Sequence, residues 1–229
     1  MNGFGSPLLN NIFRKGIFAE MTEFIICCCS LMNEESKNKK ELLPNLENEI
    51  RNKLLYAYLR ENTIKKKLGY ENLKLTFEAE SPEDYNPKTL QTTGRVDIKV
   101  ISEDTLADNS RYYTIECKRL DGKSNLNKAY VEQGVARFVS SNAKYPSPYG
   151  ENIMLGFMIC QVDIKENAEK LNKIQNSVLE KDTVIKEMFI IAEEESHCIY
   201  ESEYNSSTGE VTLKHLFFDF SSAICSKLS

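Results

Sequence analysis

Polar and apolar positions alternate with a period of two along residues 94–100, which predicts a half-buried β-strand. Its apolar side chains, expected on one face, are Val96, Ile98 and Val100. Residues 112–118 are rich in aromatic and β-branched side chains and predict a second strand. The stretch 102–110 between them is polar and turn-prone, so the two strands are expected to pair as an antiparallel hairpin.

The predicted hairpin gathers charged side chains on one face. A turn at the middle of the loop places Asp97 opposite Glu116. Lys118 lies two residues further along the second strand and shares the face of Glu116, whereas Ile115 and Cys117 point to the core on the other face. Two carboxylates and one ammonium group are therefore expected to cluster on one side of a sheet.

Facing carboxylates repel each other, so this cluster needs a compensating charge. A hard divalent cation with oxygen ligands supplies it most simply, and magnesium typically binds one or two carboxylates together with substrate phosphate. Lys118 is suited to position or deprotonate a water molecule, or to stabilise charge on phosphate oxygens. The competing interpretation is a solvated sheet face whose charges carry no chemistry.

The rest of the pattern predicts an α/β chain. Apolar residues at helical spacing predict helices over 42–61, 126–141 and 165–180. Further strands are expected over 72–79, 152–162 and 210–220. This order favours one domain, residues 1–229, built as a central mixed β-sheet flanked by α-helices.

The remaining segments are less strongly patterned. Residues 3–32 fit terminal elements packed on the main body, and 184–192 fit a strand or the end of a helix. Polar stretches predict loops or linkers over 33–41 and 81–92, and residues 193–209 are also polar.

Two acidic residues open the helix predicted over 42–61. On a helical wheel Glu47 lies beside the apolar stripe that contains Ile50, while Glu49 lies further round. Either side chain is a candidate to reach Asp97, Glu116 and Lys118. The alternative for both is that they complement the helix dipole as first-turn acids.

The helix predicted over 126–141 carries a compact polar stripe. Its members are Tyr130, Gln133, Gly134 and Arg137. A glycine inside a helix costs about 1 kcal/mol relative to alanine, so Gly134 suggests that another group approaches closely. Gln133 and Arg137 are candidates to contact phosphate or the carboxylates, and the alternative is a surface helix with a packing glycine.

An Asp on one strand followed by Glu-Xaa-Lys on the next resembles the PD-(D/E)xK nuclease superfamily, which has the restriction-endonuclease-like fold. The matching pieces are residues 94–98 and 115–118, and Val96 stands where the family name has Pro. The resemblance covers about residues 42–162 as the core with the motifs and leaves 1–41 as an N-terminal extension.

The resemblance implies a metal-dependent nuclease that hydrolyses phosphodiester bonds, with DNA favoured over RNA. Asp97, Glu116 and Lys118 would be its catalytic residues. Mg²⁺, or Mn²⁺ in its place, would be held by Asp97, Glu116 and the backbone carbonyl of Cys117. A Glu on the first helix would complete the metal site: the wheel favours Glu47, and the family's habit of a Glu just before an apolar residue favours Glu49.

The same resemblance assigns supporting roles to Gln133, Arg137 and Tyr130. The spacing of Tyr130, Gly134 and Arg137, followed by Tyr145, resembles such proteins in bacterial defence systems. It implies the effector subunit of an anti-phage complex, with a protein partner. The alternative is a nuclease fold that has lost catalysis and serves as a binding or assembly subunit.

Composition adjusts this interpretation. The formal net charge is −5, which argues against tight, autonomous, non-specific DNA binding and favours a partner subunit that supplies part of the contact. The longest uninterrupted apolar run, residues 24–29, is far shorter than a membrane span, and no secretory signal is visible, so we expect a cytoplasmic protein without membrane contact. Seven cysteines without framework spacing and two histidines predict reduced thiols and no zinc site.

Overall fold

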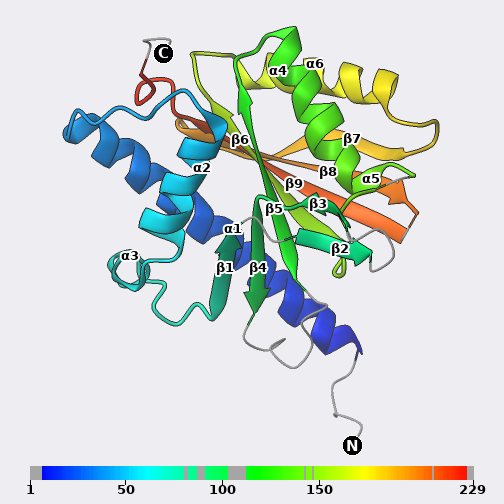
Figure 1. Ribbon diagram of the computed structural model, residues 1–229, viewed down its shortest axis with the longest axis horizontal. Helices are drawn as coiled ribbons and strands as arrows, with labels where there is room; N and C mark the ends of the chain where they lie inside the picture. The colour runs from blue at the N-terminus through cyan, green and yellow to red at the C-terminus, as the bar shows by residue number, and fades with distance from the viewer. Residues whose placement is uncertain are drawn as a thin grey trace, which may run out of the picture.

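The computed structural model describes residues 7–79, 82–86, 91–102, 112–141, 143–145, 147–207 and 209–225, of which 7–11, 13, 82–86 and 91–95 are described by their backbone alone. A seven-stranded mixed sheet with strand order β1-β4-β5-β6-β9-β8-β7 forms the centre (Figure 1). Its strands are β1 Leu75–Ala79, β4 Ile98–Ser102, β5 Tyr113–Leu120, β6 Glu151–Met158, β7 Val184–Glu193, β8 His197–Ser206 and β9 Gly209–Asp219. The predicted α/β class, a mixed sheet flanked by helices, is confirmed.

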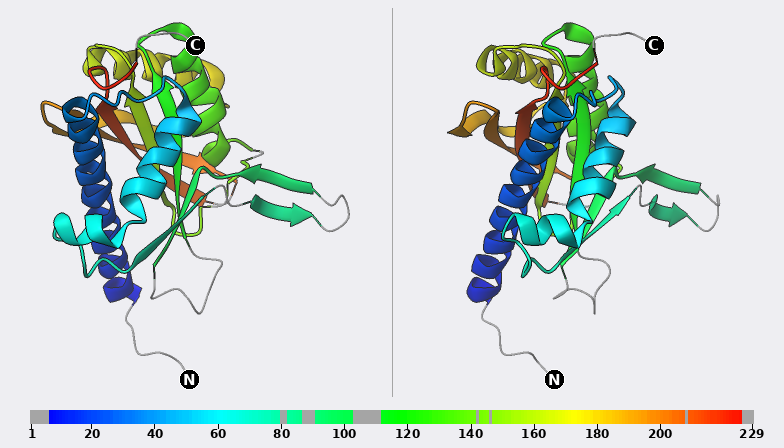
Figure 2. Two further views of the ribbon diagram at one scale, coloured as in Figure 1. Left: turned by 60° about the vertical axis from the view of Figure 1, so that its left-hand side comes forward. Right: turned by 90° about the vertical axis from the view of Figure 1, so that its left-hand side faces the viewer.

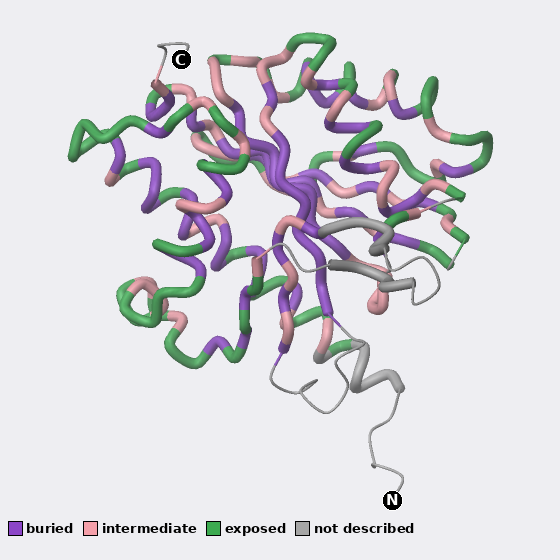
Figure 3. The backbone as a smooth tube through the Cα atoms, in the orientation of Figure 1, coloured by how far each residue is buried: buried purple, intermediate pink, exposed green. Residues whose placement is uncertain are grey.

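The three middle strands run parallel, because β6 pairs in parallel with both β5 and β9. The outer pairs β1–β4, β4–β5, β8–β9 and β7–β8 are antiparallel. Strand β6 is buried along almost its whole length, as expected for a strand covered on both faces. In Figure 3 the buried segments converge on these central strands.

Helices cover both faces of the sheet (Figure 2). One face carries α1 Pro7–Asn38, α2 Glu47–Leu54 with its π-type continuation η1 Leu55–Leu59, and α3 Asn62–Lys67. The other carries α4 Ser124–Tyr130, the π-type turn η3 Val131–Val135, α5 Ala136–Val139 and α6 Ile164–Val178.

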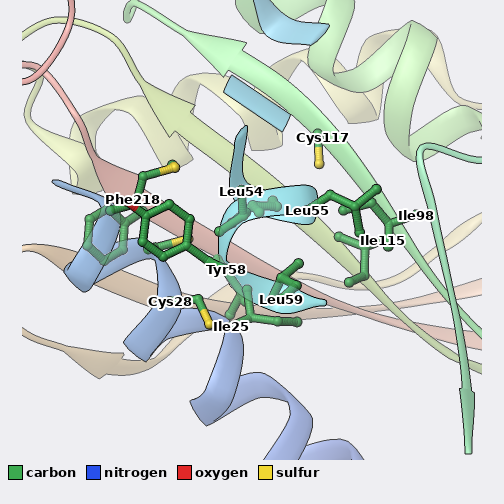
Figure 4. Close-up of a cluster of buried hydrophobic side chains, with 14 of the residues drawn as sticks. Ile25, Cys28, Leu54, Leu55, Tyr58, Leu59, Ile98, Ile115, Cys117 and Phe218 are labelled. Carbon is green, nitrogen blue, oxygen red and sulfur yellow. The ribbon is translucent and has the colours of Figure 1, made fainter. Parts of the chain in front are cut away.

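Each face has its own apolar core. The first core lies between α1, α2 and the sheet, and Figure 4 shows part of it, with Ile25 of α1 and Leu54 of α2 near Ile115 of β5. The second core lies under α4–α6 and includes Met154 of β6 and Leu171 of α6. Because β5 contributes Ile115 to one core and Leu120 to the other, its two faces separate cleanly.

The N-terminal helix is longer than the sequence pattern indicated. Residues 33–41 were expected to form a linker, but α1 continues through Asn38, where Lys37 lies in its last turn. The stretch Arg14–Asn38 is also long and apolar enough to cross a membrane by length and composition alone, although its longest uninterrupted apolar run is short. In this fold 56% of its most apolar window is buried inside the protein.

Several predicted boundaries were wrong. The helix expected from residue 42 begins at Glu47, because Leu43 instead forms a bridge with Ile224. The loop expected over 81–92 contains β2 Pro82–Asn86, which pairs with β3 Gln91–Arg95 in a separate two-stranded sheet. The polar stretch 193–209 contains the whole of β8.

The strand expected over 94–100 is broken. β3 ends at Arg95 and β4 begins at Ile98, so Val96 and Asp97 belong to neither strand. Val96 therefore packs in the second core, while Ile98 and Val100 pack in the first, and the three do not share one face. The expected hairpin loop lies almost wholly outside the described residues.

Candidate active site

The site forms where β5 continues beyond the end of its neighbouring strand, β4. The antiparallel pairing of β4 with β5 ends at Ile98 opposite Ile115, which is the register predicted from a turn at the middle of the loop. Beyond that point the chain leaves the sheet through Asp97. The backbone N–H groups of Cys117 and Arg119 would otherwise face an empty strand position.

Two carboxylates accept hydrogen bonds from those N–H groups. Asp97 Oδ2 accepts the Cys117 N–H at 2.8 Å. Glu47, from the first turn of α2, accepts the Arg119 N–H through Oε2 at 3.0 Å. The acidic side chains thus continue the hydrogen-bond ladder in place of a strand, which fixes their position against β5.

The Lys118 ammonium group lies among three oxygen atoms. It donates to Glu116 Oε1 at 2.8 Å, to the carbonyl oxygen of Cys117 at 2.9 Å and to Glu47 Oε1 at 3.2 Å. A carbonyl and two carboxylates are also the oxygen donors that a hard cation would take. In this arrangement the ammonium group neutralises them.

Two arginines complete the charged group. Arg51 of α2 donates to Asp97 Oδ1 at 2.6 Å, and its side chain is only 5% exposed. Arg137 of α5 donates to Glu116 Oε1 at 2.7 Å and also to the hydroxyl of Tyr145. Three acidic side chains therefore meet three basic ones, so the formal charges of this six-residue group balance. We call it the charged cluster: Glu47, Arg51, Asp97, Glu116, Lys118 and Arg137.

Glu116 is the most deeply buried member, with no exposed surface. Burial, followed by the nearby Asp97 carboxylate, raises the pKa of Glu116 to about 7, against the opposing effect of Lys118 and Arg137. Burial alone would lower the pKa of Lys118, but the surrounding carboxylates outweigh it and raise that pKa above its usual value. Lys118 therefore stays protonated near neutral pH.

One oxygen in the charged cluster lacks a partner. Within the described residues, Glu116 Oε2 is fully buried and accepts no hydrogen bond. A buried carboxylate oxygen without a donor is costly, and a cation or a bound water is the usual remedy. This atom is the strongest indication that the charged cluster contains an acceptor that a further ligand would satisfy.

The structure decides between the two first-helix acids. Glu47 contacts Lys118 and the β5 backbone, whereas Glu49 is exposed. Of the stripe predicted on the next helix, only Arg137 reaches Glu116.

Gln133 and Tyr130 do not join the charged cluster. Gln133 is exposed on the helix surface. Tyr130 is fully buried in the second core, where its hydroxyl bonds His215 Nδ1 at 2.8 Å. The prediction assumed a uniform 3.6 residues per turn, and the π-type turn η3 changes that phase. Gly134 does allow close approach, since a Cβ there would lie 2.5 Å from Met154 Cε and 3.6 Å from Lys118 Cγ.

Sequence reasoning missed Arg51. Its spacing of four residues from Glu47 places both on one face of α2, and this was the available signal. It also missed Asn45, whose side-chain oxygen accepts from Arg119 Nη1 at 2.9 Å and so holds the chain that enters α2.

The fit of a metal ion can be judged from these contacts. In the described part of the chain no three His, Cys, Asp or Glu side chains form a group that could hold a metal ion. The available donors are Asp97, Glu116 with its unpartnered Oε2, and the Cys117 carbonyl. Two carboxylates and one carbonyl suit Mg²⁺, which usually keeps several waters. Binding requires Lys118 and Arg51 to release oxygens they now contact.

No protein-family model matches the chain, and comparison with curated proteins and with solved structures finds no significant match to either. The function therefore has to be argued from the charged cluster itself.

Proposed function

We propose that the protein is a magnesium-dependent nuclease that hydrolyses phosphodiester bonds in DNA, with Asp97, Glu116 and Lys118 as its catalytic residues. The observation that carries the proposal is that Lys118 bonds Glu116 Oε1, Asp97 is held by the Cys117 N–H on the same strand, and Glu116 Oε2 is buried without a partner among the described residues. Side chains that were merely solvated charges would lie apart in water, whereas Glu116 is fully buried and Lys118 only 7% exposed.

Asp97, Glu116 and the Cys117 carbonyl would hold the metal ion, and Glu47 lies close enough to Lys118 to complete the set through a water. When bound, the ion polarises the phosphate and stabilises the leaving oxygen. Mn²⁺ suits the same oxygen donors.

The protein's own residues supply the remaining roles. In the metal-free protein the β5 backbone holds Asp97 through the Cys117 N–H, so this carboxylate lies beside β5 before any ligand arrives. Lys118, held by Glu116 and Glu47, presents a proton donor beside the reacting centre and can orient a water molecule. Arg137 is 30% exposed and is the member of the charged cluster best placed to contact a phosphate from solvent.

The test is cleavage of plasmid and linear DNA, and of RNA, by the purified chain with Mg²⁺, with Mn²⁺ and with chelator. Lys118→Met and Asp97→Asn keep side-chain size and are expected to lose cleavage. Lys128→Met is the matched control, since this lysine is exposed on α4 and pairs only with Glu132 in the described structure. Circular dichroism of each variant checks that it is folded.

Metal binding is measured separately through the thermal unfolding of each variant with and without Mg²⁺. Stabilisation by Mg²⁺ that disappears in Asp97→Asn supports the metal site even when cleavage needs a further subunit. Metal-dependent cleavage that survives both active-site substitutions would place the activity elsewhere and refute the assignment.

A second candidate, a nuclease fold that serves as a binding or assembly subunit, is favoured by one observation. The three cationic side chains already neutralise the three carboxylates, as in a purely structural ion-pair network. A chain that neither gains stability from Mg²⁺ or Mn²⁺ nor cleaves DNA or RNA would favour this candidate over the nuclease. The setting we propose for either is a cytoplasmic defence complex with a protein partner.

A further inference from the structure

A large cavity lies away from the charged cluster, on the α1 side of the sheet. Its volume is about 800 Å³, within the range of sites that hold small organic ligands. One wall is α1, and the other is the turn between β7 and β8, which Figure 2 shows in orange beside α1. The end of β9 closes the base.

The cavity is strongly acidic. The carboxylates at its wall are Glu23, Glu194, Glu195 and Asp219. Lys37 is the one cationic side chain that lines it, and none of the four carboxylates forms an ion pair within the described residues. An anion such as a nucleic-acid phosphate would be repelled, and a cationic ligand attracted.

A side chain with an unsatisfied acceptor lines the same cavity. Asn33 of α1 lines the cavity and is only 7% exposed. Its Nδ2 donates to the carbonyl oxygen of Asp219 at 3.1 Å, while its Oδ1 is buried and has no hydrogen-bond donor in the described part of the chain. An occupant that supplies an N–H group at this point would remove that cost.

The spread of the carboxylates excludes a single ion as the best occupant. They do not form a group that could hold a metal ion, as judged over the described residues. Partly buried Ile26 and Ile199 add apolar wall between the charged positions. The matching ligand has several separated positive charges joined by methylene groups, with N–H donors at each charge.

We propose that this cavity binds a linear aliphatic polyamine. Its ammonium groups pair with the carboxylates at the turn between β7 and β8 and at Glu23, one N–H group donates to Asn33 Oδ1, and the methylene chain packs on the isoleucines. The proposal is independent of the nuclease, because the cavity shares no residue with the charged cluster.

The test is calorimetric titration of the full chain with spermidine at physiological salt. The expected result is one saturable site, weakened about tenfold or more in the double variant Glu194→Gln/Glu195→Gln. These residues lie in or beside an exposed turn, so the fold is expected to survive. The matched control is Glu169→Gln/Glu210→Gln, which makes the same change in net charge at exposed positions outside the cavity and should bind within about twofold of wild type.

Two further measurements sharpen the result. Asn33→Ala, checked for folding by circular dichroism, should also weaken binding, and hexylamine should bind far more weakly than spermidine because it has one charge. Equal weakening in the turn variant and the control would mean non-specific attraction and overturn the proposal. The absence of saturable spermidine binding, or displacement of spermidine by an equal concentration of Mg²⁺, would overturn it as well.

Discussion

Replacing Arg51 by Met tests whether the charged cluster holds the fold together. The side chain of Arg51 is 5% exposed, and it donates to Asp97 at 2.6 Å. Methionine fills similar volume without charge or donors. The Asp97 carboxylate would then keep its bond from the Cys117 N–H and lose its buried counter-charge.

The expected magnitude follows from that geometry. Removing one partner of a buried ion pair destabilises a protein by about 3–5 kcal/mol, because the other charge is left uncompensated. Asp97 is 14% exposed and keeps one N–H donor, so the low end of the range applies, about 3 kcal/mol. For a chain of this length the melting temperature should fall by roughly 6–12 °C.

The assay is urea unfolding followed by circular dichroism, on the metal-free protein, at about 0.05 M and about 0.5 M NaCl. The loss should be nearly the same at both salt concentrations, because a buried pair is poorly screened. Lys53→Met, on the same helix but partly exposed, is the control and should change stability by less than about 0.5 kcal/mol.

A loss below about 1 kcal/mol, or one that disappears at high salt, would mean that the pair behaves like an exposed surface pair. The inference that the charged cluster holds the fold together would then be wrong. A double-mutant cycle with Asp97→Asn separates the pair from the rest, and a coupling energy of about 2 kcal/mol is expected.

Three further predictions concern other residues. Glu47→Ala should lower the free energy of unfolding by about 1–2 kcal/mol, because it leaves the Arg119 N–H without its acceptor. The control Glu49→Ala should change the free energy of unfolding by less than about 0.5 kcal/mol. Equal effects of the two substitutions in urea unfolding would contradict the assignment of Glu47. Gly156→Ala should destabilise the protein by about 1–3 kcal/mol, since its Cβ would lie 2.7 Å from the Phe217 ring and 2.9 Å from Leu120 Cδ1. An unchanged melting temperature would show that the packing around Gly156 can accommodate a methyl group. Burial lowers the pKa of His215 from 6.5 to about 3, so the folded state keeps it neutral while the unfolded state takes up a proton below pH 6.5, and stability falls as the pH drops. Between about pH 7.5 and 5.5 the wild type should therefore lose about 1 kcal/mol more than His215→Gln, and a difference that does not change with pH would refute the buried neutral histidine.

The sequence pattern predicted the strands that are buried or strongly β-branched. β1, β5, β6 and β9 lie within or close to their predicted spans, because their apolar side chains must reach a core. The register of β4 on β5 was also predictable from the loop between them. The register ends at Ile98, directly after Asp97, so the place of the candidate site beside Glu116 and Lys118 could be found without coordinates.

The rest depended on tertiary contacts. β8 alternates buried Tyr200, Ser202 and Tyr204 with more exposed positions, but a buried serine and several acids hid the period of two. Asp97 leaves the strand because its carboxylate serves β5 and Arg51, which no local pattern encodes. The π-type turn η3 likewise changed which side chains of its helix face β5.

The gap beside β5 has a spectroscopic consequence. The Cys117 and Arg119 amides donate to the side chains of Asp97 and Glu47, whereas by alternation the Glu116 and Lys118 amides face β6. A carboxylate that rotates towards a newly bound cation releases its amide. The amides of Cys117 and Arg119 should therefore exchange hydrogen faster when a cation binds, while the amides of Glu116 and Lys118 stay protected. Hydrogen exchange along this one strand thus reports cation binding, with the even-numbered amides as the internal reference.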